Sequence, residues 1–262
     1  MKRRPPRPAF IAALAVLLSL AVLQLASCRK EGEPAAPPPS SDSSENGAVP
    51  VNSDGEIIYS ETFEVGGTSL FAMASFPRTG LRAIDDYYEA EAERFKAAAS
   101  ALAEELRDTE APSYPPLEYS ARGEIVRDGG VFSVRREIYT YTGGAHSGGD
   151  TVCDNFRLPG GERLSLDDVF TVPREEYTER LLAFFDTFID SNPEPFFPDA
   201  KETLREGFPY ERFCAADGGL EFYFPPYIIG PYSSGTIVVP VPSGEIADIA
   251  DPAIFPRENT SK

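Results

Sequence analysis

The residue best suited to catalysis or metal binding is His146, the only histidine of the chain, in the stretch YTGGAHSGG at residues 141–149. A catalytic histidine needs a carboxylate and a nucleophile within hydrogen-bond reach, and a zinc site needs two or three further ligands. No second histidine is available, and glycines on both sides permit a tight turn. The residues therefore favour a structural loop over a binding surface, and a binding surface over a catalytic site. We expect no catalytic residue, no metal ion and no cofactor.

Adjacent carboxylates are the second type of residue that could carry chemistry. The sequence has such pairs at Asp85-Asp86, Asp167-Asp168 and Glu175-Glu176. Glycosidases hold two carboxylates a defined distance apart across a sugar, whereas adjacent residues of one helix or strand point in different directions. The pairs therefore fit solvated faces or the charged starts of helices better than an acid–base site. The sequence also has no phosphate-loop, dinucleotide-binding or serine-elbow motif.

An aromatic segment offers a candidate recognition surface. The stretch FYFPPYIIGPY at residues 222–232 gathers five aromatic side chains around three prolines. Prolines stiffen a surface that could recognise a sugar or a peptide, but core packing is the alternative and is favoured for most of these rings. The candidate binding residues of the two segments are Tyr141, Gly143, Gly144, His146, Tyr227 and Tyr232.

The N-terminal segment has the pattern of a bacterial export signal. Four basic residues precede an apolar run from Ala9 to Leu25, which ends in Leu-Ala-Ser-Cys. This ending resembles a lipoprotein signal, which implies cleavage before Cys28 and lipidation of that cysteine; an uncleaved anchor helix or ordinary secretory cleavage is the alternative. Acyl chains hold a protein to a membrane, since each buried methylene contributes about 0.8 kcal/mol. We expect an extracytoplasmic domain in the cell envelope, lipid-anchored to a bacterial membrane.

The two remaining cysteines, Cys153 and Cys214, are expected to lie in an oxidising compartment. They form a candidate disulfide, and two buried free thiols are the alternative. Neither lies in a Cys-x-x-Cys spacing, and a single histidine cannot complete a zinc site with them unless a carboxylate joins all three.

The charge of the chain restricts its partners. The formal net charge is −18 at pH 7, and removal of residues 1–27, which carry four basic and no acidic residues, lowers it to −22. Such a chain repels nucleic acid, so no nucleic-acid partner is expected. Its field would attract a cationic partner, although a strong net charge also serves solubility.

The chain divides into a signal, a tether and one folded region. Residues 1–27 form the signal peptide. Residues 28–55 are rich in Pro, Ser and acidic residues, which is typical of a disordered tether behind the lipidated cysteine. The folded domain is expected over residues 56–255, with subdomains at about 56–116 and 117–255, and residues 256–262 form a tail.

The patterns within the folded region predict an α+β fold. Hairpins are expected around Gly66-Gly67, around 128–130 and around 159–161, the last with ERLSL at residues 162–166 as its second strand. Apolar side chains recur at helical spacing from Leu81 to Arg107, and Pro173 opens a second helix. Strands return from about residue 211, and Pro240 and Pro242 suit an edge or the end of a strand rather than the middle of a sheet. We therefore predict mostly antiparallel, hairpin-linked strands packed with two main helices.

Three segments in order carry a resemblance to a known family. They are the strand ending in Tyr-Thr-Gly-Gly-Ala-His at residues 141–146, NFRLPGGERLSLDDVF at 155–170, and GLEFYFPPYIIGPYSSGTIVVPVPSGEI at 219–246. Together they resemble the RsiV/PdaC-like extracytoplasmic domain family. This domain of unknown function occurs in the lysozyme-sensing anti-sigma factor RsiV and at the N-terminus of the peptidoglycan deacetylase PdaC. The resemblance covers about residues 56–249.

The resemblance implies a binding role. The anti-sigma relatives have a sigma-binding segment and a transmembrane helix before this domain, and the deacetylase relatives have a catalytic domain after it. Here an export signal precedes Cys28, and a short tail follows the last matching segment. We therefore expect a stand-alone lipoprotein whose non-catalytic domain binds a cationic protein such as lysozyme, or a peptidoglycan fragment. The alternatives are a peptidoglycan-active hydrolase, a deacetylase accessory protein, or an assembly component of the envelope.

Overall fold

The computed structural model describes residues 55–109 and 115–256 of the chain. The predicted signal peptide, the lipidation site Cys28 and the tether up to residue 54 lie outside these ranges, as do residues 257–262. The described elements belong to one unit of the chain, residues 46–262. No helix within the described ranges is long and apolar enough to cross a membrane.

A six-stranded sheet accounts for the first half of the described chain, with its strands in the order of the sequence. Neighbouring strands pair antiparallel, except β2 and β3, which pair parallel. Helix α1 (Arg82–Glu105) lies between those two strands in the sequence, and its return along the sheet lets β3 run in the direction of β2. The strands are β1 (Glu56–Val65), β2 (Thr68–Pro77), β3 (Leu117–Gly129), β4 (Val131–Tyr141), β5 (Gly148–Arg157) and β6 (Glu162–Arg163).

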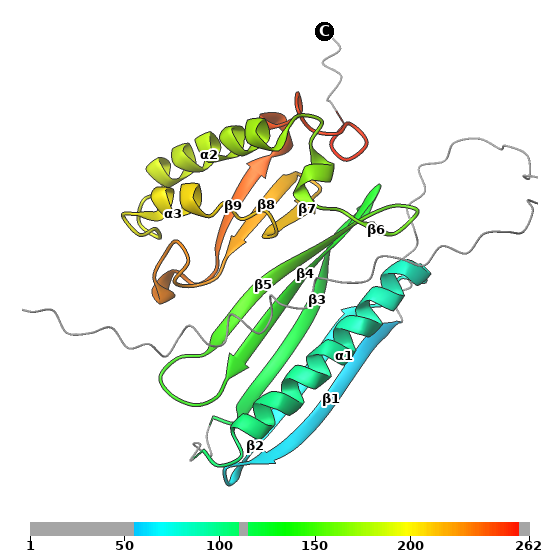
Figure 1. Cartoon of the computed structure of the whole chain (residues 1–262), viewed down its shortest axis with the longest axis vertical. Helices are drawn as coiled ribbons and strands as arrows, with labels where there is room; N and C mark the ends of the chain where they lie inside the picture. The colour runs from blue at the N-terminus through cyan, green and yellow to red at the C-terminus, as the bar shows by residue number, and fades with distance from the viewer. Residues whose placement is uncertain (1–54, 110–114, 257–262) are drawn as a thin grey trace, which may run out of the picture. The chain divides into compact units, whose positions relative to one another are not determined.

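The second half of the described chain contains a three-stranded antiparallel sheet in the order β7-β8-β9. Figure 1 shows α2 and α3 lying on one side of this small sheet. Strand β9 is an edge strand, as its prolines predict. The elements are η1 (Leu166–Val169), α2 (Arg174–Ser191), α3 (Ala200–Glu206), β7 (Phe213–Ala216), β8 (Gly219–Phe224), η2 (Tyr232–Ser234), β9 (Ile237–Pro242) and η3 (Ser243–Glu245).

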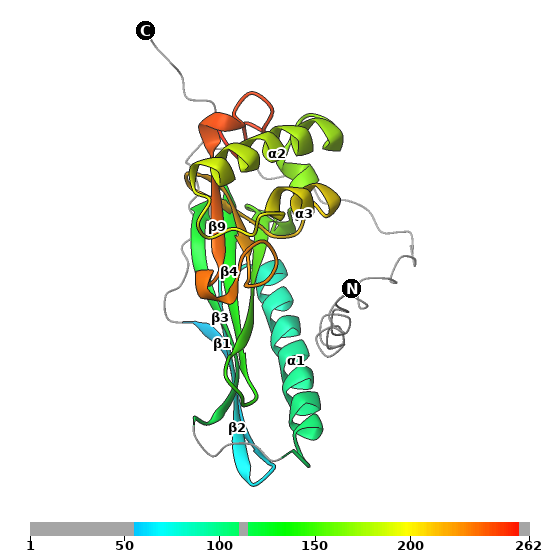
Figure 2. The same ribbon diagram turned by 90° about the vertical axis from the view of Figure 1, so that its left-hand side faces the viewer.

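Helix α1 covers one face of the large sheet (Figure 2). The apolar stripe that predicted this helix is buried against the sheet at Ile84, Tyr88 and Phe95. The Phe95 ring stacks on Tyr119 with a centroid distance of 4.5 Å, and Tyr88 stacks on Phe76 at 5.6 Å. Each large apolar side chain buried in this way contributes about 1.5–3 kcal/mol to folding.

A second apolar core lies between the small sheet and α2. Pro173 precedes the first residue of α2, as expected for a proline at a helix start. The buried face of the helix includes Tyr177, Leu181 and Phe185, and the Phe185 ring meets Phe222 of β8 edge-to-face at 5.0 Å. The small sheet is therefore held from one side by a helix with period-3.6 apolar spacing.

Asn155 of β5 joins the two sheets. Its Nδ2 donates a hydrogen bond to Phe213 O at 2.9 Å, and its Oδ1 accepts one from Ala215 N at 2.8 Å. Ser133 Oγ lies 2.9 Å from both Asn155 Oδ1 and Ala215 O. The Asn155 amide thus takes the place of a neighbouring strand along the outer edge of β7, which satisfies backbone groups that would otherwise be buried without partners.

The predicted fold class is confirmed, with one correction and one addition. The strand predicted at 162–166 is extended only at Glu162–Arg163. The chain then turns into η1, because the Asp168 carboxylate accepts a hydrogen bond from Ser165 N at 2.8 Å and closes a turn. The large sheet crosses the predicted subdomain boundary near residues 116–117, since β2 and β3 are neighbours in it.

Candidate functional site

The segment that contains His146 is the loop between β4 and β5. Gly143 and Gly144 have φ angles of 97° and 98°, in the region that glycine adopts readily and other residues avoid. The Tyr141 hydroxyl donates a hydrogen bond to Gly144 O at 3.2 Å and closes the turn. Three of the candidate residues, Tyr141, Gly143 and Gly144, therefore shape the loop that presents His146.

The aromatic segment forms the connection between β8 and β9. Tyr227 lies in it with a φ angle of 73°, the only positive φ at a non-glycine residue of the described chain. The Tyr227 N–H donates to Gly230 O at 2.8 Å, which holds this conformation. Tyr227 is 63% exposed, and Ile228 beside it is 42% exposed. A strained backbone that presents an exposed ring at a loop tip is typical of functional sites.

The two loops meet at Tyr232. Its ring lies 4.4 Å from the His146 ring, centroid to centroid, and 6.0 Å from Tyr227, which stacks on it. Its hydroxyl lies 3.2 Å from Ser147 Oγ. The structure therefore brings His146, Tyr227 and Tyr232 together from segments that are about 80 residues apart in the sequence.

A groove with a volume of about 520 Å³ lies beside this aromatic cluster. One wall comes from β4 and the start of β5, and the other from β8, β9 and the loop between them. Gly149 faces Tyr139 across the β4–β5 pair and has no side chain to cover it, so Tyr139 stays 40% exposed. The lining residues include Glu137, Tyr139, Asp150, Tyr223, Tyr232 and Val238.

Charges at the groove are paired only in part. Arg135 donates a hydrogen bond to the Tyr223 hydroxyl at 3.3 Å and forms ion pairs with Glu124 and Glu137. The hydrogen bond to Tyr223, together with the nearby Glu124 charge, raises the pKa of Arg135, and burial raises the pKa of Tyr223. Arg135 is therefore a permanent cation and Tyr223 a neutral donor. The Glu137 side chain is 64% exposed and places a negative charge on one wall of the groove.

The two internal cysteines lie behind the groove. Cys153 and Cys214 are free thiols in the structure, 5% and 0% exposed, and form one buried cluster with Tyr223. Burial, and after it a hydrogen bond with Cys153, raises the pKa of the Cys214 thiol far above its usual range. A thiol with so little thiolate is unsuited to nucleophilic catalysis.

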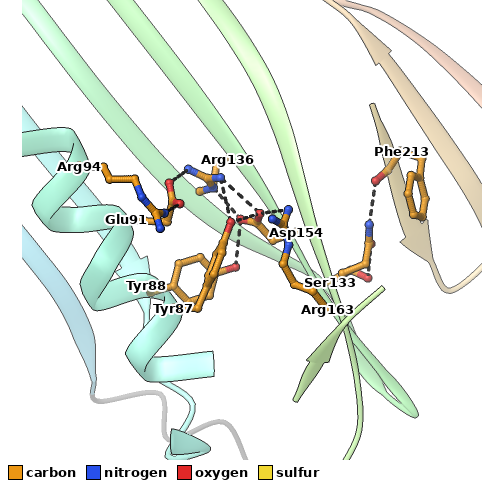
Figure 3. A network of polar contacts seen from close by, with 10 residues as sticks. Tyr87, Tyr88, Glu91, Arg94, Ser133, Arg136, Asp154, Arg163 and Phe213 are labelled. Carbon is orange, nitrogen blue, oxygen red and sulfur yellow. Dashed lines mark hydrogen bonds and ion pairs between the residues drawn. The ribbon is translucent and has the colours of Figure 1, made fainter. Parts of the chain in front are cut away.

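The opposite face of the same strands holds a buried ionic network that the sequence did not reveal (Figure 3). Asp154 is 0% exposed and accepts hydrogen bonds from the Tyr87 hydroxyl at 2.6 Å, Arg136 Nε at 2.6 Å and Arg163 Nη2 at 3.1 Å. Burial alone would lower the pKa of Arg136, but the charge and hydrogen bond of Asp154, together with Tyr87 and Glu91, raise it above its usual value. The network ties α1 to three strands and is a structural element.

Three of the adjacent carboxylates, Asp85, Asp167 and Asp168, hold local structure in place. Asp85 accepts hydrogen bonds from Thr79 N at 2.7 Å and Gly80 N at 3.0 Å, which fixes the turn before α1. Asp167 pairs with Arg174 and accepts a hydrogen bond from the Tyr177 hydroxyl at 2.6 Å, while Asp168 closes the turn at η1. Within the described ranges, no group of three or more His, Cys, Asp or Glu side chains could hold a metal ion.

Comparison with solved structures identifies the class of the fold. The chain is similar to a DUF3298 family protein from Pseudomonas aeruginosa PAO1, with 17% identity and a TM-score of 0.57 over 78% of this chain and 96% of that one. It is also similar to a DUF3298 family member from Bacteroides fragilis NCTC 9343, with 19% identity and a TM-score of 0.50 over 76% of this chain and 94% of that one. These likenesses show a shared α+β fold.

A family model also matches part of the sequence. Residues 167–244 match the model of DUF3298, a protein family of unknown function. The match runs from η1 into η3 and includes Tyr227 and Tyr232, whereas the loop with His146 lies outside it. No match was found among curated proteins.

Proposed function

We propose that this chain is a non-catalytic binding protein of the bacterial cell envelope, anchored through a lipidated Cys28. Its domain recognises an extracytoplasmic ligand through a recognition surface made of the β4–β5 loop, the β8–β9 loop and the groove between them. The observation that carries the proposal is the convergence of His146, Tyr227 and Tyr232. Two separate loops with unusual backbone angles bring the exposed His146 and Tyr227 onto Tyr232, which lines the groove.

The chemistry of this surface supports a ligand with apolar and cationic groups. Tyrosine rings offer a large contact area at a low cost in conformational entropy, and their faces attract cations. Glu137 adds a negative charge within the groove, and the chain as a whole carries a net charge of −18 before any processing. A cationic protein such as lysozyme is therefore the leading ligand, and a peptidoglycan fragment, whose sugar rings would stack on the tyrosines, is the second.

The ligand is tested by calorimetric titration of the purified chain with lysozyme and, separately, with muropeptides. Tyr227→Ala should weaken binding at least tenfold, because a central exposed tyrosine of an interface contributes about 2 kcal/mol or more. Ile58→Ala on β1 is the matched control, since Ile58 is also 63% exposed but belongs to the far edge of the large sheet. Absence of binding to both ligands at low salt would remove this proposal.

The anchor is tested separately in cells. Radiolabelled palmitate should be incorporated at Cys28, and Cys28→Ser should move the protein from the membrane fraction to the soluble fraction. Incorporation that persists in Cys28→Ser would place the lipid on another residue and contradict the anchor.

A further inference from the structure

Cys153 and Cys214 belong to different sheets and meet at the interface between them. Cys153 lies in β5 of the large sheet and Cys214 in β7 of the small sheet. Both side chains are buried in one cluster, and the two thiols interact by a side-chain hydrogen bond. A covalent bond between the two thiols would therefore join the strands at a contact that the folded chain already makes.

The neighbouring Asn155 holds the two cysteines in register. Asn155 lies two residues after Cys153 and therefore on the same face of β5. Its amide is hydrogen-bonded to Phe213 O and Ala215 N, which belong to the two residues that flank Cys214. The backbone of β7 is thus fixed against β5 at the position of the thiols, so their contact is built into the sheet interface.

The cysteine pair also adjoins the recognition surface. Cys153 faces Arg135 across the β4–β5 pair, and Cys214 shares its cluster with Tyr223. Arg135 and Tyr223 both line the groove and are hydrogen-bonded to each other at 3.3 Å. A link between the cysteines would therefore lie directly behind the residues that set the distance between the two walls.

We infer that Cys153 and Cys214 are a disulfide site, and that the bond fastens the small sheet to the large sheet behind the groove. The bond forms by exchange with an external small-molecule or protein disulfide: one thiolate attacks it to give a mixed disulfide, and the second thiolate displaces the external thiol. The two cysteines lose two protons and two electrons, and the external disulfide is reduced to two thiols. Formation of this disulfide in the cell rests on the proposed export to an oxidising compartment. The contact between the two cysteines does not depend on that export.

Burial determines when the exchange takes place. The thiols are closed off by both sheets, and the raised pKa of Cys214 leaves almost no thiolate at neutral pH. The bond therefore forms while the sheets assemble, or during opening of their interface, and is protected afterwards. In the folded, reduced chain, both cysteines should resist alkylation by iodoacetamide.

The test uses the purified chain carrying Cys28→Ser, so that Cys153 and Cys214 are its only cysteines. The chain is unfolded, reduced and refolded with mixed oxidised and reduced glutathione. We expect a mass lower by about 2 Da, a linked peptide pair, and a melting temperature about 5–15 °C above that of the same protein kept in reductant.

Two further measurements keep the inference open to refutation. Cys153→Ser with Cys214→Ser should melt at the temperature of the reduced chain and should not respond to reductant. A natively folded product that keeps two free thiols under these conditions, or a disulfide that lowers the melting temperature, would overturn the inference. None of these readouts involves a ligand, so their failure is distinguishable from failure of the proposed binding function.

Discussion

Strands β4 and β5 carry charged side chains on both faces, and the two faces differ in how completely these charges are paired. Arg136 points to α1, is 9% exposed at its side chain and contacts Asp154 and Glu91. Its neighbour Arg135 points to the other face, is 25% exposed, and its buried Nε has no hydrogen-bond partner among the described residues, although Glu137 lies 3.5 Å away. The face beneath α1 is thus a closed network, whereas the face with the groove remains open.

This difference separates structure from function along the same two strands. Buried charges require partners, so the network around Asp154 fixes α1 on the sheet. Its charged groups are occupied by one another and are not available to a ligand. On the opposite face, Asn155 and Cys153 contact the small sheet only along part of β5, and the uncovered part forms a wall of the groove. Substitutions on the first face should therefore change stability, and substitutions at the groove should change binding.

The largest effect is expected for Asp154→Ala. Removal of the carboxylate leaves Arg136 buried without its main counter-charge, which costs about 3–5 kcal/mol of unfolding free energy. Urea unfolding followed by circular dichroism measures the loss. The control is Asp150→Ala on the same strand, where the ion pair with Arg212 is partly exposed and its loss should cost less than about 1 kcal/mol. Equal losses would contradict the closed network.

The next largest effect concerns the joint between the sheets. Asn155→Ala removes the partners of Phe213 O and Ala215 N and should cost about 1–3 kcal/mol in the same assay, because buried backbone groups are left unsatisfied. Asn192→Ala is the control, since Asn192 also donates to a backbone carbonyl but is exposed. If Asn155→Ala loses no more unfolding free energy than Asn192→Ala, the Asn155 amide does not hold β7.

At the open face, a comparison of Tyr227→Gly with Tyr227→Ala separates backbone strain from ligand binding. Glycine adopts the positive φ without strain, so Tyr227→Gly should be more stable than Tyr227→Ala by about 1 kcal/mol, whereas both variants should lose ligand binding. Thermal unfolding and titration with lysozyme measure the two effects. Equal stability of the glycine and alanine variants would mean that the loop relaxes and that the tyrosine backbone is not strained.

The smallest effect concerns an exposed carboxylate and depends on pH. Hydrogen bonds from Arg174 and Tyr177 lower the pKa of Asp167. A carboxyl group whose pKa is lower in the folded state stabilises the fold above its unfolded pKa of about 3.9, and this contribution disappears as the pH falls through the folded value. The urea midpoint of Asp167→Asn should therefore lie slightly below that of the native chain at pH 7 and meet it in strong acid. A difference that persists at pH 2 would contradict this origin.

Much of the fold follows from local patterns in the sequence. The apolar spacing from Leu81 to Arg107 predicts α1, and the glycine pairs predict the hairpins, because both depend on residues that are close along the chain. The strand predicted at residues 162–166 was mostly wrong, since the chain turns where the Asp168 carboxylate accepts a hydrogen bond from Ser165 N. Local propensity cannot show such a competing contact.

The sequence indicated individual residues of the candidate site but not how they come together. Composition and glycine content drew attention to His146, Tyr227 and Tyr232, but not to their contact, which depends on how β4–β5 and β8–β9 approach one another. The groove residues Glu137 and Tyr139 carried no signal, because strand alternation does not tell which face remains uncovered. Asp154 likewise resembled any other acidic residue until its burial was known.

The sequence by itself determined the α+β class, the hairpins, the main helices and the two segments with unusual residues, because these depend on local backbone preferences and on periodic burial. Only the tertiary structure decided that the strands form two sheets, that Asn155 joins them, that Cys153 meets Cys214, and that two distant loops share one groove. Such contacts depend on side-chain packing between elements far apart in the chain, which no local pattern encodes.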